Sequence, residues 1–451
     1  MQNICAIFDI GKTNKKLLAF NENYEVVYEK QTSILEILDE EGDACDDLMA
    51  LNLWIKKEFE VLKSMPSFAI KALNFSGYGA SLVYLDKNGN AVGPIYNYLK
   101  KFPIKLKEEF WAKYNADDKF FKSVASPDLG MLNSGMQLYW LKNHKTDLYK
   151  ITKYALHFPQ YLSFLFSNLP KAEFTSIGCH TGIWDFDNWK YHEWLEKEHL
   201  HAALLPPIDA KDCTNINDLC IGPGIHDSSA ALVPYLKTNN EPFVLISTGT
   251  WCISINPFNE MPLTDQALKS DCLNFISFEG KIVRASRLFS GNEHGRQVKH
   301  LSDYYGMSEE YYKSITFNYK TVQWLRRNHK QVIPEQTELG GLKDCPFVER
   351  NLNAFRSFDE AYHQFVMDLV AQQIASTKLT IGLVFPKKIF VDGGFSKNEI
   401  FMSLLAEAFF NVEVYASEVA QASSLGAAMV ISDNWTKNEL AISALKLKRF
   451  F

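Results

Sequence analysis

Three short segments place glycine and hydroxyl residues directly after strongly apolar runs: residues 9–14 (DIGKTN), 247–250 (STGT) and 392–396 (DGGFS). Glycine lets backbone N–H groups come close to an anion, and hydroxyls add further donors. Each segment alone is equally well read as a turn that ends a strand. Three of them in one chain predict a nucleotide site. None fits the P-loop pattern, and residues 392–394 do not fit the G-x-G-x-x-G pattern of dinucleotide sites.

A second candidate for chemistry lies at residues 222–231 (GPGIHDSSAA). The glycines and the proline predict a turn, and the small residues after Asp227 can begin a helix. His226 and Asp227 would then lie at the start of that helix. A carboxylate in this place can accept the proton of a substrate hydroxyl as the hydroxyl attacks phosphorus. The alternative is that Asp227 only caps the helix.

The elements that must position these residues can be predicted from hydrophobic patterns. Residues 4–10 are almost wholly apolar, as in a strand buried on both faces, and residues 17–20 and 24–28 continue an antiparallel meander. Residues 47–63 have the spacing of an amphipathic helix. Residues 81–86 and 91–95 are predicted to form a hairpin, turned at Asn88-Gly89.

The pattern begins again near residue 240. Strands are predicted at 243–247, 251–255, 388–391 and 412–415, a hairpin at 272–278 with 281–285, and helices at 358–383, 396–410 and from about 423. No period of 20–50 residues repeats, which disfavours a solenoid or a propeller. We therefore predict two α/β domains, with a division near residues 235–241.

Composition excludes several classes of protein. The chain has 451 residues, 47% of them hydrophobic and 22% charged, which is typical of globular proteins. Its 47 basic and 53 acidic residues give a net charge of −6, which disfavours nucleic acid as a partner. The eight cysteines contain no C-x-x-C pair, and we expect reduced thiols in a cytoplasmic protein. No segment is predicted to span a membrane.

Taken together and in order, these segments resemble the FGGY family of carbohydrate kinases, within the actin-like ATPase superfamily. The resemblance includes residues 75–81 (FSGYGAS) with the hairpin after them, and residues 393–398 (GGFSKN). It implies an α/β fold of two ribonuclease-H-like domains facing a central cleft. Residues 1–236 would be mainly sugar-binding and residues 237–451 mainly ATP-binding. The implied activity is ATP- and Mg²⁺-dependent phosphorylation of a sugar hydroxyl, with a ketose such as L-rhamnulose, L-fuculose or xylulose as the expected substrate.

The resemblance also assigns roles to residues. Asp227 would be the general base, Gly79 and His226 would contact the sugar together with Asp227, and Asp9 would hold Mg²⁺. The residues expected at ATP are Gly11, Thr13, Asn14, Lys16, Gly249, Thr250, Gly393, Gly394 and Asn398. The implied partner is a small-molecule sugar, and the chain could form a homodimer.

The sequence departs from the family pattern at two places. Lys12 replaces the small hydroxyl residue usual after Gly11, and it would either add charge at a phosphate or point to solvent. Residues 96–100 (YNYLK) replace an acidic and arginine pair that would bind sugar hydroxyls, which suggests a less polar pocket. Two alternatives stay open: a non-catalytic regulator that binds a sugar or a nucleotide, and an actin-like ATPase without a sugar.

Overall fold

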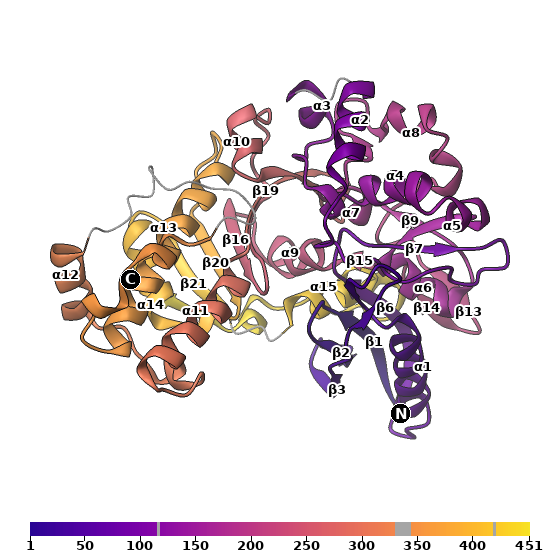
Figure 1. Cartoon of the computed structure of the whole chain (residues 1–451). Helices are drawn as coiled ribbons and strands as arrows, with labels where there is room; N and C mark the ends of the chain where they lie inside the picture. Colours follow the sequence, from indigo (N-terminus) through magenta and orange to yellow (C-terminus); the bar gives the residue numbers. More distant parts are fainter. Residues whose placement is uncertain (115–117, 330–343, 418–420) are drawn as a thin grey trace. The chain divides into compact units, whose positions relative to one another are not determined.

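The computed structural model describes residues 1–114, 118–329, 344–417 and 421–451 (Figure 1). The chain divides into two compact units. Unit 1 comprises Met1–Thr238, Asn274–Ile282 and Gln421–Leu440, and unit 2 comprises Asn239–Leu273, Val283–Ala420 and Ala441–Phe451. Two later segments of the chain therefore return to unit 1. The division into a sugar-binding domain of residues 1–236 and an ATP-binding domain of residues 237–451 stays a prediction.

Unit 1 is built on a seven-stranded sheet in the order β13-β14-β6-β1-β2-β3, with β15 also paired to β6. β1 runs parallel to β6 and antiparallel to β2. The predicted meander is confirmed, with somewhat longer strands than the sequence suggested. The strands are β1 (Gln2–Ile10), β2 (Lys15–Asn21), β3 (Val26–Thr32), β6 (Phe68–Gly77), β13 (Thr214–Ile216), β14 (Leu219–Ile221) and β15 (Ile225–His226).

Helices cover both faces of this sheet. On one face, Phe8 packs against Trp54 of α1 and Phe166 of α6. On the other face, α15 contacts β1 and β6, and it packs against α9. The predicted helix at 47–63 is confirmed, with Asp47 as its N-cap. The helices are α1 (Leu48–Lys63), α6 (Phe158–Ser167), α9 (Asp227–Thr238) and α15 (Ala422–Val430).

A mostly helical region of unit 1 has its own core, which includes Tyr96, Trp140 and Trp194. The predicted hairpin at 81–95 is wrong in its second strand. The turn at Asn88-Gly89 forms, but β7 pairs with β8, and only an isolated bridge joins Leu85 to Ala91. The elements are β7 (Leu82–Leu85), β8 (Tyr154–His157), α2 (Ile104–Tyr114), α3 (Asp118–Ser123), α4 (Ser134–His144), α5 (Thr146–Ile151), α7 (Phe174–Ile177) and α8 (Glu193–Lys197), with the short strands β4 (Ile37–Leu38), β5 (Ala44–Cys45), β9 (Ala172–Glu173), β10 (Trp184–Asp185), β11 (Lys190–Tyr191) and β12 (Pro207–Ile208).

Unit 2 is built on a second seven-stranded sheet, in the order β18-β19-β17-β16-β20-β21-β22, although residues 274–276 of β18 are grouped with unit 1. Helices α13 and α14 pack together beside it (Figure 1). The predicted hairpin at 272–285 is confirmed. The elements are β16 (Phe243–Thr248), β17 (Cys252–Asn256), β18 (Cys272–Ile276), β19 (Ile282–Leu288), β20 (Lys388–Gly393), β21 (Glu413–Ser417), β22 (Leu447–Phe450), α10 (Asp265–Lys269), α11 (Ser290–Tyr305), α12 (Tyr319–Asn328), α13 (Phe358–Thr380) and α14 (Glu399–Ala408).

The two halves thus share one plan, in which a mixed sheet begins with an antiparallel pair and continues with parallel strands. The predicted class of two α/β domains is confirmed. Among the described residues, no helix is both long and apolar enough to cross a membrane.

Candidate active site

In unit 1, the carboxyl ends of three parallel strands bring distant residues together. Ile10 at the end of β1 pairs with Gly77 at the end of β6, and Gly77 pairs with His226 at the end of β15. Open α/β sheets bind ligands at this edge, because loops leave the strands there and side chains can converge. The edge therefore collects Asp9, Gly79, His226 and Asp227, which the sequence singled out separately.

Asp227 begins α9, as predicted, and its carboxylate lies in an unusual environment. Its Oδ1 accepts a hydrogen bond from the Ser228 N–H at 2.6 Å and lies 3.3 Å from His226 Nε2. Burial first, and the Asp9 carboxylate second, raise the pKa of Asp227 to about 7, although 35% of its side chain stays exposed. A carboxylate with this pKa is partly ionised near neutral pH and can both take up and release a proton there, which suits a general base.

Asp9 is held in place by two serines of α15, near the C-terminal end of the sequence. Its Oδ2 accepts hydrogen bonds from the Ser423 and Ser424 hydroxyls, both at 2.7 Å. These serines lie in the first turn of α15, a segment that the sequence analysis predicted only as a closing helix. The small residues of α15 were a signal of close helix packing, but nothing local pointed to Asp9.

The first glycine loop is tight and its tip is exposed. The Gly11 N–H donates to the Asn14 carbonyl at 3.0 Å, and Thr13 and Asn14 are exposed. Lys16 lies opposite Asp9 in the β1–β2 register, so both side chains are on the same face of the sheet. Of the residues of this loop and strand that were predicted at ATP, Lys16 is thus the one that the register places beside Asp9.

Gly79 lies against His226, the other residue predicted at the sugar. A Cβ atom on Gly79 would be 2.8 Å from His226 Nε2 and 3.2 Å from Cys179 Sγ. Phe275, from the hairpin segment that returns to unit 1, packs on His226 with ring centroids 5.5 Å apart. Cys179 and Phe275 each come from a segment without a motif, so no sequence pattern indicated that they would lie at this site.

A buried carboxylate fixes the backbone before Asp227. Glu173 accepts hydrogen bonds from the Thr175 hydroxyl at 2.6 Å and its N–H at 2.8 Å, and the same hydroxyl accepts from the His226 N–H at 3.0 Å. Burial raises the pKa of Glu173 to about 7. This network holds the strand end from which Asp227 projects.

In unit 2, the second and third glycine loops are joined through Thr248. The Gly394 N–H donates to the Thr248 carbonyl at 3.0 Å, and the Phe395 N–H donates to the Thr248 hydroxyl at 3.0 Å. Gly393 has φ of 80°, and a Cβ atom there would overlap the Thr248 carbonyl. Gly249, Thr250 and Gly394 are exposed around this junction, as expected of Gly249 and Thr250 at the phosphates and of Gly394 at the adenosine.

Two further side chains of unit 2 border these loops. Asp392 is buried, its pKa is raised to about 7 by burial, and its Oδ2 has no hydrogen-bond partner among the described residues. Asn398 caps α14 through the Phe401 N–H and donates to the Tyr362 hydroxyl at 2.8 Å. Both ends of the Asn398 amide are therefore used within unit 2, so its side chain shapes the loop.

The residues present fit ATP with Mg²⁺. Exposed glycines and hydroxyls suit phosphates, and each unit by itself offers a carboxylate of the kind that Mg²⁺ or its waters prefer, Asp9 in unit 1 and the unsatisfied Asp392 oxygen in unit 2. In the described part of the chain, no three His, Cys, Asp or Glu side chains gather as a metal site. A Mg²⁺ ion that binds together with a nucleotide is generally held by one or two carboxylates and the phosphates.

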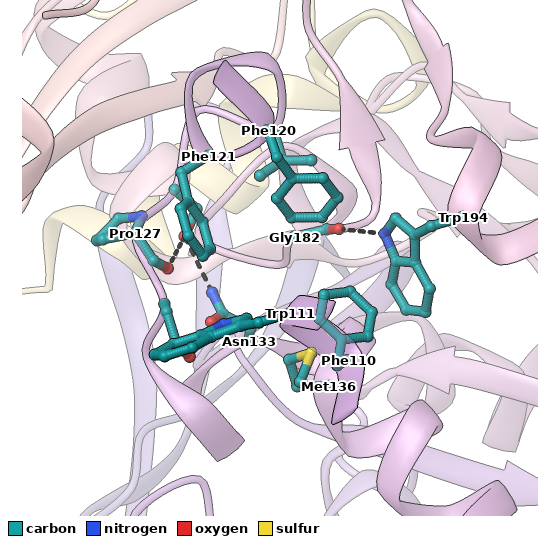
Figure 2. Close-up of a pocket in the computed structure, with 12 residues that line it drawn as sticks. Phe110, Trp111, Phe120, Phe121, Pro127, Asn133, Met136, Gly182 and Trp194 are labelled. Carbon is teal, nitrogen blue, oxygen red and sulfur yellow. Dashed lines mark hydrogen bonds between the residues drawn. The ribbon is translucent and has the colours of Figure 1, made fainter. Parts of the chain in front are cut away.

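A hollow in the helical region of unit 1 does not add a second site. It lies among aromatic side chains, including Phe110, Phe120 and Trp194, whose indole N–H donates to the Gly182 carbonyl at 3.0 Å (Figure 2). Its volume is about 20 Å³, which is room for about one water molecule. We interpret it as a packing gap.

Comparison with known proteins identifies the family of the chain. Residues 4–209 match the N-terminal domain of the FGGY family of carbohydrate kinases, and residues 240–439 match the carbohydrate kinase FGGY C-terminal domain. Together the two matches span most of the sequence. The chain belongs to the FGGY family of carbohydrate kinases.

Individual relatives are distant. A rhamnulokinase of Oceanobacillus iheyensis is 23% identical over 45% of this chain and 45% of its own length, and one of Halalkalibacterium halodurans is 22% identical over 58% and 57%. The matched region thus spans about half the length of these curated relatives. A crystal structure of a carbohydrate kinase from Novosphingobium aromaticivorans has a TM-score of 0.75 at 20% identity and covers 99% of this chain and 94% of its own. That likeness shows that the two proteins share one fold.

Proposed function

We propose that this protein transfers a phosphoryl group from ATP to a hydroxyl of a sugar, with Asp227 as the general base. The observation that carries the proposal is the Asp227 carboxylate, whose pKa of about 7 allows it to take a proton near neutral pH. It lies at the same sheet edge as Gly79 and His226, the residues expected at the sugar. Phosphoryl transfer needs positioning, charge neutralisation and one base, and no covalent nucleophile.

Each unit has its own part in the proposal. Unit 1 binds the sugar through Gly79 and His226, and Asp227 removes the proton of the attacking hydroxyl. The ATP phosphates are bound by the exposed backbone N–H groups and hydroxyls of Gly11, Thr13, Asn14, Gly249 and Thr250. Gly393, Gly394 and the loop shaped by Asn398 border the adenosine, and Lys16 adds positive charge. Mg²⁺, held by Asp9 directly or through water, neutralises phosphate charge.

For the substrate class we favour a ketose, and among ketoses one with an apolar part. The named relatives are rhamnulokinases. In this chain, the buried Phe275 ring packs on His226 and the buried Cys179 thiol lies beside Gly79, so an apolar layer backs the residues that we assign to the sugar. A 6-deoxyketose has a methyl group that suits such a wall.

The test is sugar-dependent ADP release with Mg²⁺-ATP, over L-rhamnulose, L-fuculose, D- and L-xylulose, D- and L-ribulose and glycerol. Asp227→Asn keeps the size of the side chain but removes the base, so we expect it to lower kcat by about 10²–10⁴ while ATP binding is retained. Asp147→Asn, at a carboxylate that is 96% exposed, is the matched control.

Three outcomes would contradict the proposal in different ways. Near-wild-type turnover in Asp227→Asn removes this residue from the mechanism. ATP binding without any sugar-dependent turnover favours a regulator. Sugar-independent ATP hydrolysis at a substantial rate favours an actin-like ATPase.

A further inference from the structure

We propose that Lys12, paired with Asp46, recognises the sugar and is not a phosphate ligand. The inference rests on the proposed function and deepens it, because it names a specificity-determining pair and the class of sugar that the pair accepts. Lys12 lies within the first glycine loop, and from its position in the sequence a phosphate role is the obvious one. Its contacts point elsewhere.

The Lys12 ammonium is already bound by two carboxylates. Its Nζ lies 2.6 Å from Asp46 Oδ2 and 2.9 Å from Glu36 Oε1, and 17% of the side chain is exposed. Burial opposes its charge, but Asp46 and Glu36 outweigh burial, and the pKa of Lys12 lies above its usual value. Two of its three N–H donors are therefore engaged, and the two carboxylates already offset its positive charge, so little of that charge is left to attract a phosphate.

Asp46 connects Lys12 to the residue before Gly79. The Tyr78 hydroxyl donates to Asp46 Oδ2 at 2.8 Å, and the Lys12 ammonium lies 5.9 Å and 6.0 Å from the ring centroids of Tyr78 and Tyr98. Tyr78 directly precedes Gly79, which lies against His226. Through Tyr78, Lys12 and Asp46 are thus connected to Gly79, which we assign to the sugar. We call this part of the sheet edge the sugar side.

The strand register separates this side from the phosphate side. Lys16 shares the face of Asp9, whereas Lys15, as the preceding residue in the strand, points to the opposite face. Lys15 joins the Lys12 cluster there: its Nζ donates to the Lys12 carbonyl at 2.7 Å and lies 3.6 Å from Asp46 Oδ1. Asp9, in contrast, binds the serines of α15. The first glycine loop and the strand after it therefore supply lysines to both sides: Lys16 lies on the face of Asp9, and Lys12 and Lys15 lie at Asp46.

The chemistry of the cluster selects neutral sugars. Lys12 and Lys15 carry two positive charges, and Asp46 and Glu36 carry two negative charges, so the group as a whole has no net charge to attract an anion. Asp46 holds Lys12 in place, the Lys12 ammonium keeps one N–H beyond its two carboxylates, and Glu36, whose side chain is 43% exposed, offers an acceptor, so the cluster matches two neighbouring hydroxyls. We infer that the substrate is a neutral sugar with adjacent hydroxyls, and that a sugar acid is a poor substrate.

The experiment compares two lysines of the same segment by steady-state kinetics. We expect Lys12→Met to raise the KM for the sugar about tenfold or more, as for a lost charged hydrogen bond, and to leave the KM for ATP within about twofold. Lys16→Met should show the reverse pattern. Lys12→Gln keeps a donor and should fall between Lys12→Met and the wild type, and Asp46→Asn should resemble Lys12→Met. Melting temperatures exclude variants that do not fold.

The outcomes separate this inference from the proposed function. A raised KM for ATP with an unchanged KM for the sugar in Lys12→Met makes Lys12 a phosphate ligand and overturns the inference alone. Unchanged values for both substrates assign the pair a structural role and overturn it as well. If the wild type prefers sugar acids such as gluconate, the inference is overturned, but the proposed function as a sugar kinase stands. A wild type that phosphorylates no sugar overturns the proposed function, and this inference with it.

Discussion

At the scale of single residues, the protonation of Asp227 governs the proposed reaction. Its pKa is about 7, and the usual value for aspartate is 3.8. The causes are burial and the negative charge of Asp9, and both disfavour the ionised form. A base must be ionised to accept a proton, so the fraction of active protein rises with pH through the pKa.

We therefore expect kcat/KM for the sugar to rise about tenfold per pH unit below pH 7 and to level above it, because at saturating Mg²⁺-ATP this ratio reports the ionisation of the enzyme before it binds the sugar. The measurement is kcat/KM from pH 5 to 9 at saturating Mg²⁺-ATP. A profile that stays flat down to pH 5 would show that Asp227 has an ordinary pKa or is not the base.

At the scale of elements, α15 carries the serines that hold Asp9. Ser423→Ala with Ser424→Ala removes both hydrogen bonds to Asp9 Oδ2. Partners that orient a metal ligand typically contribute about 10–100-fold to metal affinity. We expect the Mg²⁺ concentration for half-maximal activity to rise by at least about tenfold, and the melting temperature to change little. Ser443→Ala, outside this contact, is a control. An unchanged Mg²⁺ requirement would show that Asp9 does not depend on α15.

The packing of α15 against α9 depends on a glycine. A Cβ atom at Gly426 would overlap the backbone carbonyl of Ala230, which cannot move away as a side chain could. We expect Gly426→Ala to lower the free energy of unfolding by about 1–3 kcal/mol, as in other overpacked sites.

The matched control for this substitution is Gly295→Ala. Gly295 is in α11, and a Cβ atom added there would have no other atom within 4 Å. We expect a gain of up to about 1 kcal/mol at this position from helix propensity. Chemical denaturation measures both variants. Equal effects at the two sites would contradict the close contact between α15 and α9.

At the scale of the whole molecule, unit 1 is not continuous in sequence. Gln421–Leu440 belongs to unit 1, and α15 covers the β1 and β6 face of its sheet with buried residues such as Leu425 and Val430. A fragment of residues 1–238 would expose that apolar face to water.

We expect the fragment 1–238 to unfold without a cooperative transition and to bind a hydrophobic dye. The same fragment joined through a flexible linker to residues 421–440 should recover a cooperative transition. Circular dichroism melting and dye fluorescence compare the two. A fragment 1–238 with a sharp transition and no dye binding would show that the returning segment is dispensable.

Local patterns determined much of this molecule. An apolar run such as β1 is a buried strand in almost any context, and the spacing of α1 together with the Asp47 cap specifies a helix with a defined start. Glycine and hydroxyl residues after buried strands indicated the three loops, and Asp227 was singled out because it begins a helix after a turn. The predicted pairing of β7 with residues 91–95 was wrong. All four residues of β7 are buried, and the strand pairs with β8, which lies far from it in the sequence.

Tertiary structure alone decided which side chains meet. Asp9 and Ser423 are 414 residues apart, and only the return of α15 to unit 1 joins them. Lys12 and Lys16 are in one short segment, yet the alternation of β2 and the position of Asp46 direct them to different sides of the sheet edge. Periodicity specifies how a segment folds because it depends on near neighbours, whereas a binding site depends on contacts that exist only after distant segments have packed.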